Sequence, residues 1–480
     1  MPNATRRESS DSPTNLRWLL ATASGAHAAD QLSLAAVPLT AVVAYGADAR
    51  AVGMLVAVQS AAWLLVSLPG GALVDRWSGL AVLRVAMSFT AIALATVIAA
   101  VLVGWWPGLM AGAFGTSAGT VLFVLVAGSV LPRWVPAEGL ARANSRLELA
   151  RATVTLGAPI LVGGLVQRGW VVAAWTAALA AALLAALGAW AMSDGRGPAT
   201  SAGERSGARA WLTTDIAEGA VFVWRQPVLR AIAACAVLWN FAFFALVAAF
   251  VPFASGALGL SPASIGAVQA AYGAGMLAGA LSATRLLRRV PPAAILIGGP
   301  ACSVAAAVLL AVAPFGAAMP AALAAYWLIG FGPMLWLICQ TSLRQRITPA
   351  GMLGRVGATI QVAIYGVRPL GALAGGFGGS LLAPSTLMSV IGMTFLASTL
   401  VVLSGPLVRL RTWPPALTAS TCPARARGRP LPSDPHGSRS EPGSPARSHG
   451  IARSPGPRAR RSPAPCSPSA QSPTARGSER

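Results

Sequence analysis

The chain has no lysine and little charge of any kind. All 36 basic residues are arginine, only 14 residues are acidic, and charged residues make up 10% of the 480-residue sequence. A soluble globular domain carries about 25% charged residues, so an ordinary soluble fold is excluded. Four long segments contain no charged residue: 85–132, 231–284, 290–343 and 369–408. Because these apolar runs are continuous, they indicate membrane-spanning helices and not the short alternating strands of a membrane β-barrel.

Several kinds of chemical site are also missing. The five cysteines are scattered without the spacing of a disulfide framework or a metal site, so we expect small apolar residues or free thiols: Cys235, Cys302, Cys339, Cys422 and Cys466. No paired histidines, acid cluster, nucleophile elbow or phosphate-binding glycine loop occurs. We therefore expect no enzymatic activity, no metal and no cofactor. The N-terminus has no cleavage signal after a short apolar core, so no cleaved signal peptide is expected.

The arginines fall in clusters between apolar segments, and this spacing predicts both the number of spans and their topology. The clusters return after every second apolar segment, which places them on one side of the membrane, and cytoplasmic loops are the ones enriched in arginine. The sequence thus predicts a multi-pass protein of the cytoplasmic membrane with both termini in the cytoplasm. Twelve helices are expected: 18–45, 51–73, 81–103, 108–131, 143–167, 170–192, 231–254, 262–284, 292–313, 317–341, 353–382 and 385–408.

The expected fold is an all-α membrane protein with twelve transmembrane helices in two pseudo-symmetric six-helix halves. Residues 71–76 and 136–142 have counterparts at 279–285 and 349–355, and such repeats are typical of transporters with a site between the halves. The expected parts are a cytoplasmic N-terminal segment (1–17), the first half (18–192), a cytoplasmic linker (193–230), the second half (231–408) and a tail (409–480). Within the linker, residues 215–227 are expected to form an amphipathic surface helix.

The tail is rich in proline, serine and arginine and has no apolar periodicity, so it is expected to be disordered. It is either a solvated extension or a polybasic arm attracted to anionic lipids. The net charge of +22 does not indicate nucleic-acid binding, because the arginines lie in this tail and in loops between apolar helices.

The turn after the second predicted helix contains Gly71, Asp75 and Arg76, followed by Gly79 and Arg84. Taken alone, it is a tight turn with a charged cap. The pattern resembles the loop signature of the major facilitator superfamily, although Leu80 and Ala81 stand where that signature has basic residues. The resemblance implies a conformational switch in which Asp75 joins a charge relay that stabilises the outward-facing state, with Arg84 as its further basic member.

The fifth predicted helix contains Gly157, Pro159, Gly163 and Gly164. Small residues allow close helix packing and proline adds a kink. The segment is similar to the superfamily's antiporter signature, which is associated with exporters. Four further segments resemble the macrolide-efflux and enterobactin-exporter branch: 140–145, 215–227, 354–356 and 368–372.

Two charged residues are expected near the bilayer midplane. Asp30 lies well inside the first predicted helix, and His27 shares its helical face. A carboxylate there costs several kcal/mol unless it is paired, hydrated or protonated, so these residues are candidates for proton coupling. Arg368 is the corresponding cation and a candidate for the substrate cavity, where a cation binds an anionic group or lowers the pKa of a nearby acid. The alternative for each of these residues is a structural role. Four further residues are cavity candidates: Trp239, Asn240, Gln340 and Gln361.

Together these features predict a secondary active transporter that exports a hydrophobic or siderophore-like small molecule by proton antiport with alternating access. The expected partners are the substrate, protons and membrane lipids, with no nucleic acid, and the protein is expected to be a monomer. Two alternatives stay open: a metabolite importer of the same fold, and a non-transporting membrane sensor or scaffold.

Overall fold

The computed structural model describes residues 5–134, 137–193, 208–349 and 352–414, and within these ranges the chain is helical without any strand. Twelve of the helices are long and apolar enough to cross a membrane, which confirms the predicted fold class. The α-helices are α1 (Thr5–Tyr45), α2 (Ala49–Arg76), α3 (Gly79–Val103), α4 (Trp106–Trp134), α5 (Ala137–Gln167), α6 (Val171–Ala191), α7 (Ala208–Arg225), α8 (Pro227–Gly256), α9 (Pro262–Arg289), α10 (Pro292–Val312), α11 (Ala318–Ile347), α12 (Leu353–Leu381) and α13 (Pro384–Ser404).

Short polar turns begin and end the helices. Asp48 Oδ1 accepts a hydrogen bond from the Ala51 amide at 2.8 Å, which caps α2, and Ser78 Oγ accepts one from the Ala81 amide at 3.1 Å, which caps α3. Gly104 ends α3 in the left-handed conformation, with φ +71°, which a residue with a side chain rarely adopts. These turns are short enough to hold each pair of consecutive helices antiparallel.

Some predicted boundaries differ from the observed ones. Helix α1 begins at Thr5 and not at residue 18, so most of the expected N-terminal segment continues the first span as helix. Helix α8 begins at Pro227 and not at 231, because proline fits the first turn of a helix and Arg230 does not interrupt it. The linker helix α7 covers Ala208–Arg225 and so begins before the predicted residue 215.

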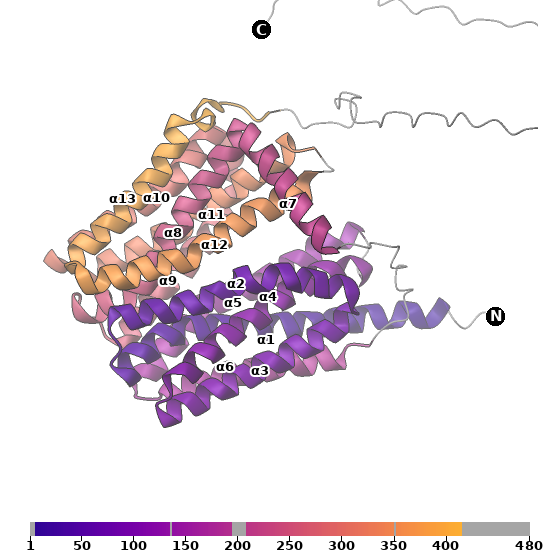
Figure 1. Cartoon of the computed structure of the whole chain (residues 1–480), viewed down its shortest axis with the longest axis horizontal. Coiled ribbons are helices and arrows are strands. Elements are labelled where there is room, and N and C mark those ends of the chain that lie inside the picture. Colours follow the sequence, from indigo (N-terminus) through magenta and orange to yellow (C-terminus); the bar gives the residue numbers. More distant parts are fainter. Residues whose placement is uncertain (1–4, 135–136, 194–207, 350–351, 415–480) are drawn as a thin grey trace, which may run out of the picture. The chain divides into compact units, whose positions relative to one another are not determined.

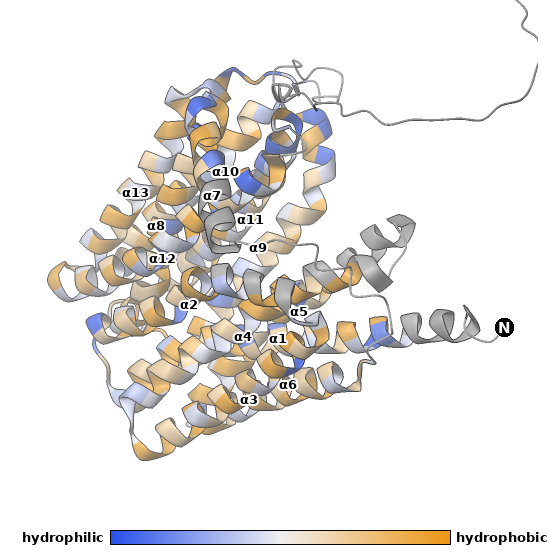
Figure 2. Cartoon of the chain, turned by 45° about the vertical axis from the view of Figure 1, so that its right-hand side comes forward, coloured by the Kyte–Doolittle hydropathy of each residue, from blue (hydrophilic) through white to orange (hydrophobic). Residues whose placement is uncertain are grey.

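The twelve spans form two bundles, α1–α6 and α8–α13 (Figure 1). Large apolar side chains are exposed along the outer faces of both bundles, including Leu102, Leu187, Leu281 and Met393, each more than 60% exposed. Figure 2 shows the same distribution, with hydrophobic residues along the helices and most strongly hydrophilic residues near helix ends. The lipid phase is the environment that removes such surfaces from water.

The two ends of the molecule differ in charge. We call the end with the α2–α3, α4–α5, α9–α10 and α11–α12 connections the arginine-rich end, because the arginine clusters lie there. The opposite end has the α1–α2, α3–α4, α5–α6, α8–α9, α10–α11 and α12–α13 connections. Most of the internal arginines of the described chain therefore lie at the end where α1 begins. The sequence predicts this one-sided distribution of arginine.

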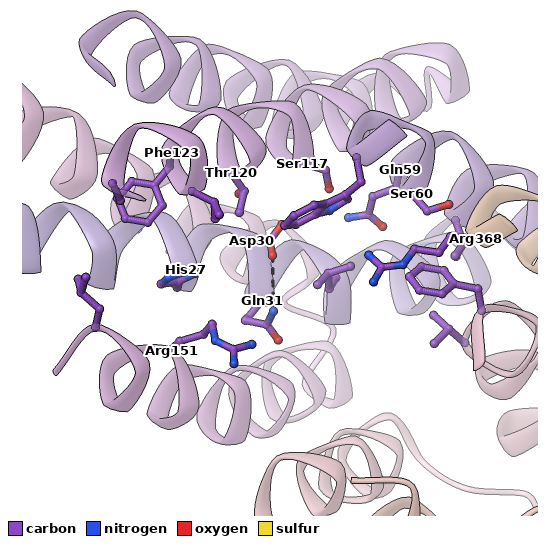
Figure 3. A pocket seen from close by; sticks show the side chains of 18 of the residues that line it. His27, Asp30, Gln31, Gln59, Ser60, Ser117, Thr120, Phe123, Arg151 and Arg368 are labelled. Carbon is purple, nitrogen blue, oxygen red and sulfur yellow. Dashed lines mark hydrogen bonds between the residues drawn. The ribbon is translucent and has the colours of Figure 1, made fainter. Parts of the chain in front are cut away.

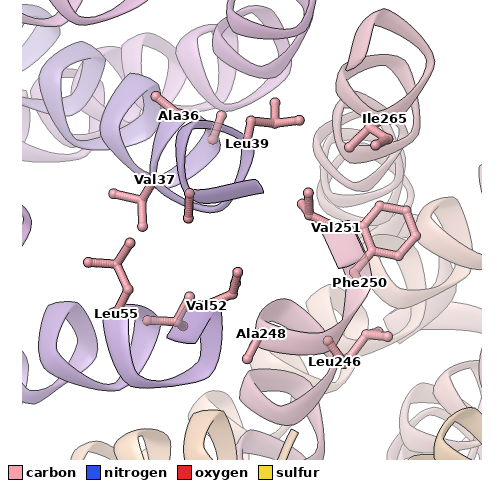
Figure 4. Close-up of a cluster of buried hydrophobic side chains, with 14 of the residues drawn as sticks. Ala36, Val37, Leu39, Val52, Leu55, Leu246, Ala248, Phe250, Val251 and Ile265 are labelled. Atoms are coloured by element: carbon pink, nitrogen blue, oxygen red, sulfur yellow. The ribbon is translucent and has the colours of Figure 1, made fainter. Parts of the chain in front are cut away.

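The halves contact each other closely at the opposite end. A Cβ atom placed on Gly53 of α2 would lie 2.5 Å from Cα of Gly376 of α12, and one on Gly163 of α5 would lie 2.5 Å from the Pro262 carbonyl oxygen of α9. Backbones approach this closely only where side chains are absent. Beside these contacts, a cluster of buried apolar side chains from α1, α2, α8 and α9 fills the space between the halves (Figure 4). This end of the molecule is closed.

The linker helix α7 packs on the second half. Val223 belongs to a buried cluster with Val356 and Ile360 of α12. Glu218 accepts a hydrogen bond from Arg355 of α12 at 2.6 Å, forming an ion pair. A Cβ atom on Gly219 would lie 2.6 Å from the Arg355 carbonyl oxygen, so the two helix backbones are in close contact.

Residues 409–414 also pack on the second half. Leu410 accepts a hydrogen bond on its carbonyl oxygen from the Ala293 amide at 3.1 Å. The Arg346 guanidinium lies 5.2 Å from the centre of the Trp413 ring, within the range of a cation–π contact. The first residues of the segment expected to be a tail therefore belong to the folded bundle, because Leu410 and Trp413 give it apolar side chains to bury. Residues 415–480 lie outside the described part of the chain.

Candidate functional site: a cavity between the two halves

Two adjoining cavities lie between the halves. The first has a volume of about 640 Å³ and is lined mainly by α1, α2, α4 and α5, and the second has a volume of about 580 Å³ and is lined mainly by α8, α9, α11 and α12. Arg151, Phe244 and Arg368 line both, so the cavities meet at these residues. Their walls include Leu131 and Arg344, near the arginine-rich ends of α4 and α11, whereas the opposite end is closed by the glycine contacts.

Asp30 lies in the first cavity and is buried, with 5% of its surface exposed. Gln31 Nε2 donates a hydrogen bond to Asp30 Oδ2 at 3.5 Å, a long and weak interaction. Asp30 Oδ1 has no hydrogen-bond partner in the described part of the chain. The Thr120 hydroxyl lies beside the carboxyl but donates to the Thr116 carbonyl oxygen. A buried carboxylate with one oxygen unsatisfied is costly in its ionised form, and protonation removes that cost.

His27 lines the same cavity as Asp30, one helical turn away on α1. Its ring meets the edge of the Phe123 ring with the centroids 5.4 Å apart (Figure 3). The predicted pairing of His27 and Asp30 on one face of α1 is therefore present, and both side chains face the space between the halves.

Arg368 projects into the cavities from α12 (Figure 3). Its Nε donates a hydrogen bond to Asn240 Oδ1 of α8 at 3.2 Å. Its guanidinium lies 5.0 Å from the Phe244 ring, 4.8 Å from the Tyr365 ring and 6.0 Å from the Trp63 ring, measured to the ring centres. The aromatic rings hold the cation in place, and the structure describes no ion pair for it.

The second cavity has an aromatic wall. Trp239 and Phe243 stack with their ring centres 4.9 Å apart and their planes at 12°, and Phe243 stacks on Tyr272 at 5.6 Å. The Trp239 indole donates a hydrogen bond to Ser303 Oγ at 2.9 Å, which fixes its orientation. All five predicted cavity residues line this cavity: Trp239, Asn240, Gln340, Gln361 and Arg368.

Two polar atoms of this wall are unsatisfied in the described part of the chain: Trp336 Nε1, a hydrogen-bond donor, and Gln340 Oε1, an acceptor. Both residues line the second cavity. Buried polar atoms without partners are rare in folded proteins. These two atoms are themselves covered, so a ligand in the cavity reaches them only after the side chains move.

Arg151 is a cavity residue that the sequence does not single out as a site residue. It falls inside the predicted helix 143–167, lies on α5 in the structure and lines both cavities. Figure 3 shows Arg151 and Arg368 on opposite sides of the space, with Asp30 and Gln31 between them. Its position fourteen residues into a helix of 31 residues is the signal that could have identified it.

The residues of the predicted conformational switch lie at the arginine-rich end. Helix α2 ends at Arg76, and the side chains of Asp75 and Arg76 lie outside the described part of the chain. Arg84 donates hydrogen bonds to the carbonyl oxygens of Ala189 and Met192, at 3.3 and 2.6 Å, and so binds the C-terminal end of α6. Gly71 has no neighbouring atom within 4 Å of a Cβ position.

The antiporter-like segment of α5 faces α9 of the other half. The Pro159 carbonyl oxygen would lie 2.3 Å from a Cβ atom on Gly266, and Gly163 is equally close to α9. A Cβ atom on Gly157 would have no neighbour within 4 Å, and one on Gly164 would meet only Arg168 Nη1, at 3.8 Å. Two of its four predicted residues, Pro159 and Gly163, are therefore at the contact between the halves.

The family to which the sequence matches has the same architecture as the structure. The profile described as the Major Facilitator Superfamily matches residues 19–372. The chain belongs to the major facilitator superfamily. A comparison with curated proteins gives no match.

Solved structures of other transporters share the superfamily fold. A bacterial homologue of the iron transporter ferroportin in the inward-facing state has a TM-score of 0.64 and 16% identity, covering 82% of this chain and 98% of that one. A bacterial homologue of the human lysosomal transporter Spinster has a TM-score of 0.61 and 13% identity, covering 83% of this chain and 96% of that one. A D-xylose–proton symporter has a TM-score of 0.61 and 15% identity, covering 81% of this chain and 96% of that one. At these identities the likeness concerns the fold alone.

As a superfamily member, this protein is a multi-pass membrane transporter. In the described ranges no group of three His, Cys, Asp or Glu side chains could hold a metal ion. Among the side chains that the structure describes, the cavity offers the buried carboxyl of Asp30, several arginines and a set of aromatic rings.

Proposed function

We propose that this protein is a secondary active exporter that carries a hydrophobic or siderophore-like small molecule out of the cell by proton antiport. The arginine-rich end would face the cytoplasm, following the enrichment of arginine in cytoplasmic loops. The cavity then opens inward in this conformation, and rocking of the halves would open it outward. The segments that resemble the macrolide-efflux and enterobactin-exporter branch support the direction.

The observation that carries the proposal is Asp30, a buried carboxyl with an unsatisfied oxygen in the cavity between the halves. Binding a proton there removes a buried charge. Because the two conformations expose Asp30 to different sides of the membrane, each would take up or release the proton on its own side. Coupling follows if substrate and proton occupy the cavity in alternation.

The test is substrate flux and proton flux measured together in proteoliposomes. Asp30→Asn mimics the protonated carboxyl, so we expect uphill export driven by a proton gradient to be lost while downhill exchange persists. Asp48→Asn is the matched control, because Asp48 caps α2 outside the cavity and asparagine caps equally well. Uphill pumping by the Asp30→Asn protein would show that Asp30 is a structural acid. Uptake in place of export would reverse the assigned direction.

A further inference from the structure

Helix α7 has an apolar side that no part of the described chain covers. Its inner side packs on α12 through Gly219 and Val223. On the outer side Trp224 is 71% exposed and Val221 50% exposed, and Ala220 is exposed beside them. Apolar side chains that share an exposed helix face cost free energy in water and are typical of a contact surface. Next to a membrane-spanning helix, such a face is available to lipid.

Two exposed arginines flank Trp224. Arg225 lies in the last turn of α7, and Arg230 lies in the first turn of α8. The Arg230 guanidinium lies 5.6 Å from the centre of the Trp224 ring, within the range of a cation–π contact, and its Nη1 donates a long hydrogen bond to the Trp224 carbonyl oxygen at 3.4 Å. The ion pair described for α7 joins Glu218 to Arg355 and leaves these two arginines without a carboxylate partner in the described part of the chain.

The depth of these residues in the membrane follows from the charge pattern. Arg230 is the last charged residue before the charge-free run 231–284. Because charged side chains are costly in the hydrocarbon core, the core begins after Arg230, which puts Trp224, Arg225 and Arg230 at the level of the lipid headgroups. Tryptophan is enriched at this level, where its ring has an apolar and a wet side. The arginines add positive charge that attracts anionic headgroups.

We propose that the junction of α7 and α8 binds an anionic phospholipid, with the phosphate bound by Arg225 and Arg230 and an acyl chain along Trp224 and Val221. Guanidinium groups bind phosphate through charge-assisted hydrogen bonds, and the apolar side of α7 requires a ligand that also carries a chain. A lipid bound here holds α7 in its position on α12. The proposal goes beyond transport and depends neither on the direction of transport nor on the substrate.

The test measures lipid binding at the junction itself. In full-length protein whose native cysteines are replaced by alanine, Ala220→Cys carries an environment-sensitive dye on the outer side of α7. The purified protein in detergent is titrated with phosphatidylglycerol, with phosphatidylcholine of the same acyl chains, or with inorganic phosphate. We expect phosphatidylglycerol to bind at least about fivefold more tightly than phosphatidylcholine, because arginines near the membrane surface favour anionic lipid by about this factor. Inorganic phosphate should leave the dye unchanged.

Three results would overturn the proposal. An equal response to the two lipids would mean a general membrane contact without an anion site. A response to inorganic phosphate that matches the response to phosphatidylglycerol would mean a site for free anions. No response to either lipid would mean that another surface, such as that of the first half, covers this side of α7.

The arginine variants separate charge from structure. Arg225→Gln and Arg230→Gln should each weaken phosphatidylglycerol binding about fivefold and change phosphatidylcholine binding less than about twofold. Arg230→Lys should keep most of the affinity, because lysine keeps the charge. Arg288→Gln is the matched control, since Arg288 is an exposed arginine at the same end, in the last turn of α9. An equal loss in the control would show that the lipid responds to the charge of the whole end and not to this junction.

The tryptophan variant tests the apolar part of the site. Trp224→Ala should weaken the binding of both lipids at least about threefold, because the indole contacts the interfacial region that the two lipids share. Trp170→Ala is its control, since Trp170 is 58% exposed but lies at the opposite end of the molecule. Unchanged binding in Trp224→Ala, at an unchanged unfolding temperature, would show that the lipid does not lie along α7.

Discussion

Gly163 and Gly164 are neighbours in the sequence with different surroundings, and they offer a paired test of the closed end. A Cβ atom on Gly163 meets the Pro262 carbonyl oxygen at 2.5 Å, whereas one on Gly164 meets nothing closer than Arg168 Nη1 at 3.8 Å. Gly163→Ala should therefore disfavour the conformation closed at this end by ~1–3 kcal/mol, the usual cost of overpacking. Gly164→Ala should leave it unchanged.

The readout is the labelling rate of Val52→Cys, a fully buried residue of the apolar cluster at that end. With a membrane-impermeant thiol reagent, we expect labelling at least about five times faster in Gly163→Ala than in the parent, since ~1 kcal/mol changes a population ratio about fivefold. Similar rates in the two alanine variants would show that the glycine contact does not hold this end closed.

Single residues in an extreme environment could be predicted from the sequence, but the pairs that they form could not. Asp30 and Arg368 were identifiable because a charge inside an apolar segment is rare. Arg151 lies inside the predicted helix 143–167, but other arginines precede it closely in the sequence, so it stands out as an internal charge only once α5 is known to begin at Ala137. The contact between Arg368 and Asn240, 128 residues apart, depends on the packing of α8 against α12, which no local pattern specifies.

Helix α7 is attached to the second half by backbone contact more than by charge. In the Glu218–Arg355 ion pair, the Glu218 side chain is 51% exposed and the Arg355 side chain 35% exposed. Ion pairs that are exposed to this degree contribute about 0–1 kcal/mol to stability. Gly219→Val should separate α7 from α12, because its Cβ would meet Thr359 Oγ1 at 2.5 Å and the Arg355 carbonyl oxygen at 2.6 Å. We expect hydrogen exchange of the α7 amides to accelerate at least about tenfold.

The control is Ala220→Val, at an exposed position of the same helix. It should change the exchange of α7 by less than about threefold, because only its modest effect on helix propensity remains. Glu218→Gln should also have a small effect. A larger acceleration in Glu218→Gln than in Gly219→Val would mean that the ion pair is the main attachment.

The chain after α13 can be divided by truncation. Deleting residues 415–480 should leave membrane insertion and flux intact, since the sequence there has no apolar periodicity to form a core. Deleting 409–480 should lower the unfolding temperature by about 3 °C or more, because Leu410 and Trp413 then leave the α10 and α11 surface. Equal unfolding temperatures for the two truncations would show that residues 409–414 add no stability.

The number and order of the spans could be predicted from the sequence, because length, apolarity and arginine placement act on each segment independently. The first residues of α1 and α8, Thr5 and Pro227, could not be predicted in this way. The first turns of these helices contain polar residues or proline, so the apolar pattern begins later than the helix does. The closed end could not be predicted either. Gly53 and Gly376 carry no signal of contact until the halves are assembled.

Topology is testable with two exposed positions. In a protein whose native cysteines are replaced by alanine, we expect Arg168→Cys to react with an impermeant thiol reagent from outside intact cells. Ser193→Cys, at the arginine-rich end, should react only after the membrane is opened. The reason is that cytoplasmic loops hold the arginine excess. Labelling of Ser193→Cys in intact cells would invert the topology and the direction proposed for transport.

The charge on the cavity walls makes the carrier itself sensitive to membrane voltage. Arg368 carries its charge inside a membrane-spanning helix, and the described part of the chain gives it no ion pair. In the proposed orientation, the conformation in this structure exposes that charge to the negative interior of the cell. Each elementary charge that moves across the whole potential changes the energy by about 2.3 kcal/mol per 100 mV. An inside-negative voltage therefore favours the inward-open conformation of the empty carrier.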